Sequence, residues 1–360
     1  MNPDLVILLT ALLVSTASAL LGSFLVLRRM ALVTDAIAHA VLPGIVLAYW
    51  LSGGKATLPA LLGAAGAGLL TVSLVEGLVR TGRVKNDAAI GIVFPVLFSL
   101  GVLWVSISFR NVHLDLDAVL YGEIAYAPFN TLVLLGREVP ESWLIMGGLA
   151  LLNLLFVLLF YKELKLATFD AGLAAALGFY PGVLHYALMA LVSLTAVGAF
   201  QSVGAILIVA FLIIPPATAY LLTRRLPAMI GLAVALGWAS ALLGYALALW
   251  LDTSIAGAMA TVAGGFFALA FLFSPSQGYL TARARHARHR LWVAARLLVT
   301  HLAHHPGPVA REEVQEEFGW RPRFLQRVEQ EARREGWLEP KPGALQLTLK
   351  GLEEGRRPPA

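Results

Sequence analysis

The chain has 360 residues, of which 58% are hydrophobic and 14% charged, with no cysteine and a net charge of +5. This composition excludes an ordinary soluble globular domain and is typical of a protein that crosses a membrane several times. The absence of cysteine also excludes a disulfide framework and thiolate metal ligands.

Charge divides the chain into two parts. Residues 1–280 carry 12 Lys/Arg and 12 Asp/Glu, whereas residues 281–360 carry 15 and 10, together with five of the eight histidines. We therefore predict an all-α polytopic membrane domain over 1–280 and a small cytoplasmic domain over 281–360.

Nine apolar segments are long enough, or nearly so, to cross a bilayer. We predict about nine transmembrane helices at 5–27, 33–51, 58–80, 88–108, 142–161, 183–199, 202–222, 228–250 and 256–274. The first segment is expected to be retained rather than cleaved as a signal peptide, because no Lys or Arg precedes it.

Basic residues in the short loops predict the orientation. Nine Lys or Arg residues fall in loops on one side and three on the other. The side richer in basic residues is expected to be cytoplasmic, which places the N-terminus outside and the C-terminal part in the cytoplasm. An odd number of helices agrees with this orientation.

Two ionisable residues, Asp35 and His39, interrupt the second apolar segment. A carboxylate near the bilayer centre costs roughly 3 kcal/mol, so it needs a partner or a function. Four residues apart on a helix, both side chains leave the same face, and their oxygen and nitrogen atoms suit a divalent transition metal. A structural Asp–His hydrogen bond is the alternative, and the spacing does not choose between the two.

Other polar residues of the membrane part are weaker candidates. His113, Asp115 and Asp117 lie on the predicted outer side, where they could meet an incoming cation or form an ordinary loop or helix cap. Two further groups could line a pathway through the membrane. They are the pair at a Gly-flanked break, Gln201 and Ser202, and a proline pair expected to disturb its helix, Pro215 and Pro216.

The predicted cytoplasmic loop over 169–181 contains a short helix of small residues. Asp170 can cap its start, Gly178 can end it and Pro181 prevents its continuation. Such a helix could dock into a partner protein or be an ordinary capped connector.

The part after residue 280 predicts three helices and a hairpin. The helices cover about 291–304, 311–318 and 322–335, and the strands are Trp337–Leu338 and Leu345–Leu349. A basic stretch before them, 283–290, suits anionic lipid headgroups. This order resembles a winged helix-turn-helix of metal-responsive repressors, although interleaved glutamates on the third helix make DNA an unlikely partner. His301, His304 and His305 could form a regulatory metal site.

Five motifs occur in one order over roughly residues 5–275. They are Leu27–Met30 with Asp35–Gly44, Asp87–Ile92, Leu114–Asp117 with Leu120–Gly122, Phe169–Asp170 with Ala174 and Leu177–Gly178, and Val203–Gly204 with Ile213–Ala219. Together they resemble the permeases of zinc, manganese and iron ABC importers. The position of Tyr121 is more often Phe in that family, and residues after 280 lie outside its common pattern.

The resemblance implies a type II importer permease fold and a transport subunit rather than an enzyme. It implies a homodimer with one ion pathway, two cytoplasmic ATPase subunits, an extracytoplasmic metal-binding protein and a location in the inner (plasma) membrane. Asp35 and His39 would be metal ligands. A coupling helix would contact the ATPase through Phe169, Asp170, Ala174, Leu177 and Gly178. No permanently bound cofactor is implied, since the divalent metal (Zn²⁺, Mn²⁺ or Fe²⁺) is the cargo.

Two alternatives stay open. The chain could be a permease for a larger metal chelate, such as a siderophore or cobalamin, or a membrane-anchored regulator that responds to metal. No Gly-x-x-x-x-Gly-Lys-[Ser/Thr] motif is present, so ATP hydrolysis is assigned to a separate chain.

Overall fold

The computed structural model describes residues 2–52, 57–108, 124–134, 136–275, 277–305, 307–339 and 344–356. The chain divides into two compact units, Met1–Ser276 (unit 1) and Gln277–Ala360 (unit 2). Each unit has a hydrophobic core of its own.

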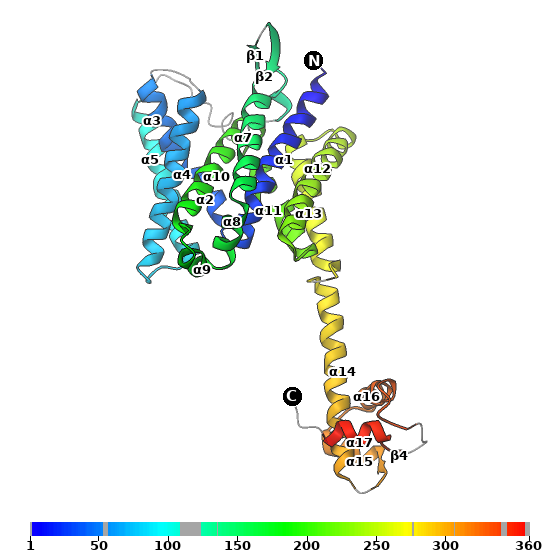
Figure 1. The fold of residues 1–360 in the computed structure, drawn as a ribbon. Coiled ribbons are helices and arrows are strands. Elements are labelled where there is room, and N and C mark those ends of the chain that lie inside the picture. The colour runs from blue at the N-terminus through cyan, green and yellow to red at the C-terminus, as the bar shows by residue number, and fades with distance from the viewer. Residues whose placement is uncertain are drawn as a thin grey trace. The chain divides into compact units, whose positions relative to one another are not determined.

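Unit 1 is a helical bundle (Figure 1). Among the described residues, eight helices are long and apolar enough to cross a membrane: α1 (Pro3–Leu27), α4 (Thr57–Arg80), α5 (Asn86–Ser108), α7 (Glu141–Leu159), α10 (Pro181–Val203), α11 (Ala205–Leu222), α12 (Leu226–Leu251) and α13 (Ile255–Phe273). They correspond to eight of the nine predicted segments. Large apolar side chains remain exposed on them, for example Leu103, Leu158 and Trp250, as lipid contact requires.

The remaining predicted segment, 33–51, is not one continuous helix. It forms two short helices, α2 (Ala31–Ala40) and α3 (Leu42–Ser52), which are separated at Val41. Pro43 explains the interruption, because in a continuous helix its ring would collide with the carbonyl of His39. In the observed arrangement Pro43 stands in the first turn of α3, where its missing N–H costs least.

The sixth and seventh segments were predicted to be separated between 199 and 202. In the structure the separation is one residue long and lies further along the chain. Helix α10 continues to Val203 and α11 begins at Ala205, so that only Gly204 separates them. Gln201 and Ser202 therefore belong to the last turn of α10 and not to a loop.

Helix α11 contains Pro215 and Pro216 in its interior, against the expectation of a disturbed helix. Each proline removes a donor for the carbonyl four residues earlier. The carbonyl of Leu212, which Pro216 leaves without its helical donor, contacts Gly22 of α1 so closely that a side chain at Gly22 would collide with it. Tight packing of α1 on α11 thus surrounds the weakened turn, and α11 runs on to Leu222.

Helix α1 is the centre of unit 1. It packs against α7, α10, α11 and α12, and its residues Val14, Leu21 and Phe24 are fully buried. Buried polar side chains join these helices: Asn153 of α7 donates to the carbonyl of Ala17 at 3.2 Å and to Thr195 of α10 at 2.9 Å. Such bonds fix the helices relative to one another where apolar packing alone is not directional.

The two ends of unit 1 differ (Figure 1). One end carries the N-terminus and a hairpin that was not predicted. The hairpin consists of β1 (Thr131–Leu134) and β2 (Arg137–Pro140), paired antiparallel with Leu132 opposite Val139, and it follows the short 3-10 helix η1 (Ile124–Tyr126). The other end carries α8 (Tyr161–Phe169), also not predicted, and α9 (Ala171–Ala176). We call it the α9 end.

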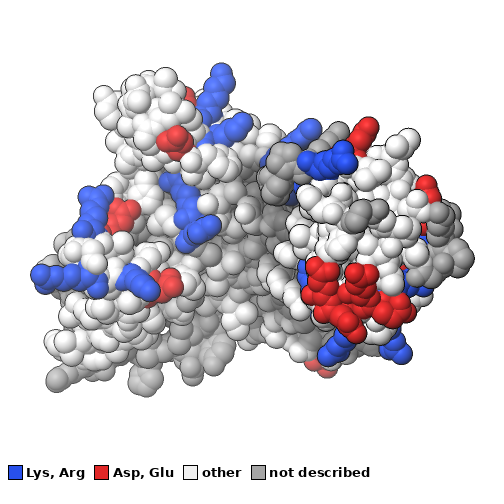
Figure 2. All heavy atoms as spheres, turned by 90° about the horizontal axis from the view of Figure 1, so that it is seen from below, with Lys and Arg blue, Asp and Glu red and all other residues white. Residues whose placement is uncertain are grey.

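The basic residues that were predicted to share one side lie in the chain segments of the α9 end. Eight of the nine are exposed: Arg29, Arg80, Arg83, Lys85, Lys162, Lys165, Arg224 and Arg225. In Figure 2, which views the molecule from below, Lys and Arg side chains are spread over the left-hand part of the view, which is unit 1, with fewer acidic ones.

The described residues of unit 2 form four helices and short strands. They are α14 (Tyr279–His304), β3 (Val309–Ala310), α15 (Arg311–Phe318), α16 (Pro322–Arg334), β4 (Ala344–Leu345) and α17 (Leu349–Arg356). The three predicted helices are present, but α14 begins at Tyr279, twelve residues earlier than predicted, and includes the basic stretch. The predicted second strand ends early, since α17 begins at Leu349.

Antiparallel backbone pairing connects separate segments of unit 2. Val309 pairs with Leu345, and Leu338 forms a bridge with Leu347. The core is formed by one face of α14, α15 and α16, including Leu298, Val314 and Val328. Glu329 is also buried and pairs with Arg311 at 2.6 Å. Glu329 is one of the glutamates on the third helix that argued against DNA binding. Because it faces the interior, it does not contribute to the surface charge of unit 2.

Candidate functional site

Helix α2 carries the Asp35 and His39 positions in the interior of unit 1. It packs against α4, α5, α10 and α11, and its residues Val33, Ile37 and Ala40 are buried. His39 is half-buried, with its ring centroid 5.6 Å from that of Phe94 of α5. The side chain of Asp35 lies outside the described part of the structure. Because α2 is a regular helix over Ala31–Ala40, the four-residue spacing places both positions on one face.

The secondary candidates of the membrane part are placed as follows. His113, Asp115 and Asp117 lie outside the described residues. Ser202 is buried and donates to the carbonyl of Gly198 at 2.8 Å, so its hydroxyl is satisfied within its own helix, whereas Gln201 is exposed. Pro215 and Pro216 are buried against the neighbouring helices.

The short helix α9 forms as the sequence predicts. The Oδ1 atom of Asp170 accepts a hydrogen bond from the backbone N–H of Leu173 at 2.8 Å, which caps the first turn. Gly178 has a φ of +87°, a backbone conformation that ends the helix and strains any residue with a side chain. Pro181 then begins α10.

Helix α9 presents apolar side chains to the surface. Ala174 is fully buried, and the residues around it are exposed: Phe169 (64%), Leu173 (47%), Leu177 (61%) and Tyr180 (76%). We call these four residues the α9 patch. The patch lies beside polar connections and basic residues, where exposed apolar side chains in a group indicate a protein contact.

A polar network that sequence reasoning missed joins four helices at the same end. Glu76 of α4 lies 2.6 Å from Nε2 of His185 and accepts from the hydroxyl of Tyr186 at 3.0 Å, both on α10. Arg28, which follows α1, contacts Nδ1 of His185 at 3.3 Å and donates to Thr168 of α8 at 3.1 Å. Thr168 stands two residues before the cap of α9, so the network links the bundle to α9.

The contacts of His185 indicate which of its two ring nitrogens carries the proton. A guanidinium group has only donors, so Nδ1 of His185 accepts from Arg28 and the ring proton is on Nε2, which faces Glu76. The charged side chains of Arg28 and Glu76 are therefore bridged by a neutral ring. Glu76 was recognisable in the sequence as the only acidic residue of the segment 58–80, where a carboxylate needs a partner.

Replacing Glu76 by alanine is expected to lower the thermal stability of the purified protein in detergent. The change leaves the His185 N–H and the Tyr186 hydroxyl without their acceptor in a largely buried place, at a cost of about 1–3 kcal/mol. Arg80→Ala is the matched control, because Arg80 is 76% exposed and its contact with Glu76 is long, at 3.4 Å. Equal unfolding temperatures for the two variants would show that the network does not stabilise unit 1.

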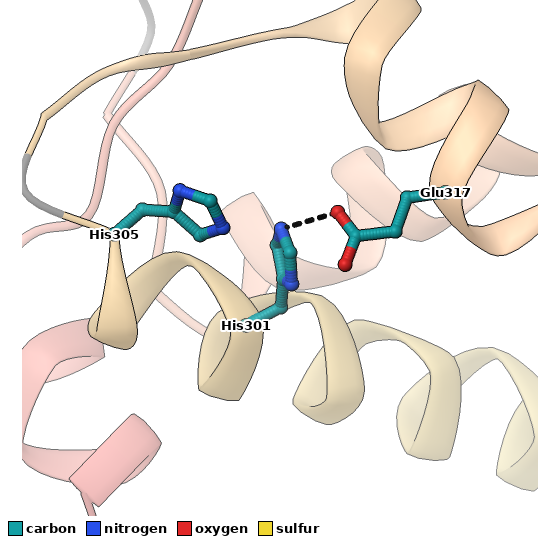
Figure 3. A group of neighbouring side chains, drawn as sticks. All are labelled: His301, His305 and Glu317. Carbon is teal, nitrogen blue, oxygen red and sulfur yellow. Dashed lines mark ion pairs between the residues drawn. The ribbon is translucent and has the colours of Figure 1, made fainter.

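The histidines of unit 2 are grouped differently from the prediction. His301 and His305 lie together with Glu317 of α15, which sequence reasoning missed (Figure 3). His304 is not a member of this group, because its Nδ1 atom contacts the carbonyl of Thr300, 2.8 Å away on its own helix. His304 is the last residue of α14, whereas His305 follows the helix with an extended backbone.

Comparisons with known proteins agree over the length of unit 1. The family model described as "ABC 3 transport family" matches residues 5–274. The manganese transport system membrane protein MntD of Bacillus subtilis is 46% identical over 280 residues, which are 78% of this chain and 95% of MntD. The zinc transport system membrane protein TroD of Treponema pallidum is 45% identical over 352 residues, 96% of either chain, so its likeness includes unit 2.

Two solved structures have similar folds. PsaBC from Streptococcus pneumoniae, in complex with a Fab, is 33% identical with a TM-score of 0.65, covering 79% of this chain and 96% of that chain. A putative metal-chelate type ABC transporter in an inward-facing conformation has a TM-score of 0.52, covering 74% and 84%. At 19% identity, the second likeness shows the fold alone.

Proposed function

Because this chain belongs to the ABC 3 transport family, we propose that it is the membrane permease of an ATP-driven importer for a divalent transition metal ion. The observation that carries the proposal is the family match over residues 5–274, which includes every long apolar helix of unit 1. The names of MntD and TroD, a manganese and a zinc transport protein, support a metal ion as the cargo.

Asp35 and His39 are the proposed metal ligands of the pathway. They stand four residues apart on a helix enclosed by other helices, where ionisable side chains require a function or a partner. In a homodimer, two copies would supply two oxygen and two nitrogen donors, a shell that suits Zn²⁺, Mn²⁺ or Fe²⁺. The homodimer and the choice of metal are part of the proposal.

The α9 patch is the proposed contact for the ATPase subunit. Its four apolar side chains surround a helix too short to cross a membrane, at the end of unit 1 that carries the exposed basic residues. That charge supports a cytoplasmic α9 end and an outer N-terminus. The other proposed partner is an extracytoplasmic metal-binding protein, which would deliver the ion at the opposite end.

Unit 2 is the proposed regulatory part, with a winged-helix-like arrangement. Helices α15 and α16 are followed by a paired segment, Leu338 with Leu347, in the position that a wing would take. This assignment separates a membrane domain over 1–280 from a cytoplasmic domain over 281–360.

Removing unit 2 discriminates the importer from a membrane-anchored regulator. A chain that ends at Gln277 is expected to import metal when combined with its ATPase, because unit 1 has its own core. At high internal metal the truncated importer should remain active, whereas the full-length importer should slow. Loss of all uptake on truncation would favour the regulator, and identical inhibition curves would leave unit 2 without a regulatory role.

The function itself is tested by reconstitution. The purified chain and its ATPase in lipid vesicles should accumulate radioactive manganese or zinc only with ATP. Excess unlabelled Zn²⁺, Mn²⁺ or Fe²⁺ should compete, whereas a metal-loaded siderophore or cobalamin should not. Competition by the chelate instead of the free ions would establish the alternative cargo.

A further inference from the structure

We propose that His301, His305 and Glu317 form a binding site for a divalent transition metal ion in unit 2. The three side chains come from two elements: His301 lies in the last turns of α14, His305 directly follows α14, and Glu317 lies near the end of α15. Figure 3 shows the two imidazole rings and the carboxylate directed toward one another. One ligand atom from each residue lies within 4.8 Å of the other two.

The distances suit a metal ion between the three groups. Nε2 of His301 lies 3.1 Å from a carboxylate oxygen of Glu317. Two ligands bound at about 2.0–2.2 Å in a tetrahedral shell stand roughly 3.3–3.5 Å apart, so this pair needs little movement. The ring centroids of His301 and His305 are 4.4 Å apart, and His305 and Glu317 are exposed, which leaves them free to adjust.

His301 is held in place before any ion arrives. Its side chain is only 13% exposed, and the ring packs edge-on against Phe318 at 5.2 Å. A fixed imidazole beside two adjustable donors reduces the ordering that binding requires. Exposure of the other two donors gives the ion a route from solvent.

An ion pair between His301 and Glu317 explains the positions of the three side chains less completely than a metal site does. That pair would be complete without His305, and two charged imidazoles close together would repel each other. Neutral imidazoles around one cation remove the repulsion, and three protein donors leave a fourth position for water. With two nitrogens and one oxygen, the site should prefer Zn²⁺ to Mn²⁺, following the general affinity order of these ions.

The bound ion would connect the end of α14 to α15. Unit 2 would then contain a metal-dependent link between two of its helices. This site is different from the proposed pathway ligands Asp35 and His39. This inference does not depend on the transport function of unit 1, since the donors belong to unit 2 alone.

The test is a Zn²⁺ titration of the full-length protein, purified without a histidine tag and carrying Asp35→Ala and His39→Ala. These two changes remove the proposed pathway ligands, so that binding reports unit 2. In competition with a chromophoric chelator, one Zn²⁺ per chain is expected. A further His305→Ala or Glu317→Gln change should weaken binding by roughly tenfold or more, since even indirect partners of metal ligands contribute that much. Both side chains are exposed, so neither change should unfold the domain.

His304→Ala is the matched control. It removes a neighbouring histidine that contacts its own helix, so the Zn²⁺ affinity should stay unchanged. No stoichiometric binding, or an equal loss in the His304 and His305 variants, would overturn the site. Binding of Mn²⁺ with higher affinity than Zn²⁺ would overturn the assigned preference.

Discussion

Alanine at Asp35 or at His39 is expected to abolish metal uptake in vesicles that contain the permease and its ATPase. Each change removes a proposed ligand from an enclosed helix, and apolar neighbours cannot replace an oxygen or nitrogen donor. Folding should be retained, because removing a carboxylate from a membrane helix relieves an insertion cost of roughly 3 kcal/mol. Uptake of radioactive manganese or zinc, beside the yield of assembled complex, measures both effects.

Conservative variants separate metal binding from packing at these positions. Asp35→Asn keeps the side-chain volume and removes the charge, so it should fail to transport if Asp35 is a ligand. Asp87→Ala is a control for loss of an acidic residue, since Asp87 is exposed in the first turn of α5. Wild-type uptake by assembled Asp35 and His39 variants would make the pair structural.

A glutamate in place of Leu177 is expected to uncouple ATP hydrolysis from transport. Leu177 is 61% exposed in the α9 patch, and a docked partner would bury it, so a charge there would lose its water without gaining a counter-ion. A hot-spot residue near the centre of an interface costs about 2 kcal/mol when it is replaced, which predicts roughly a thirtyfold loss in ATPase affinity if Leu177 is one. The measurement is ATPase binding to the permease, together with metal-stimulated hydrolysis.

Leu222→Glu is the matched control for this variant. Leu222 is also an exposed leucine, 39% accessible, and it ends α11 in a connection that carries basic residues on the same face. The control should bind the ATPase normally. If both variants bound and coupled like the wild type, the α9 patch would not be the contact.

Local features of the chain were sufficient to predict most of unit 1. A run of apolar residues is a property of consecutive positions, and so is a capped helix such as that between Asp170 and Gly178. The same holds for Asp35 and His39, whose spacing assigns them to one helix face. The likeness to metal importer permeases rested on ordered motifs and is confirmed by the family match.

The errors arose where neighbours distant in sequence decide the outcome. A proline pair predicts a disturbed helix, yet α11 continues because α1 packs against the weakened turn at Gly22. Pro43 is also packed closely, against Gly101 of α5, yet there the helix is interrupted at Val41. A proline in an apolar segment therefore does not decide by itself whether the helix continues.

By itself, the sequence determined the class of protein, eight of its long helices and which residues carry polar donor atoms, because hydrophobicity and donor chemistry belong to single residues. Only the tertiary structure decided which of those residues meet. It joined Glu76 to His185 and Arg28 across three helices, and it grouped His301 and His305 with Glu317 while leaving His304 apart. Side-chain contacts of this kind depend on how helices rotate against each other, and that rotation is set by the packing of the whole unit.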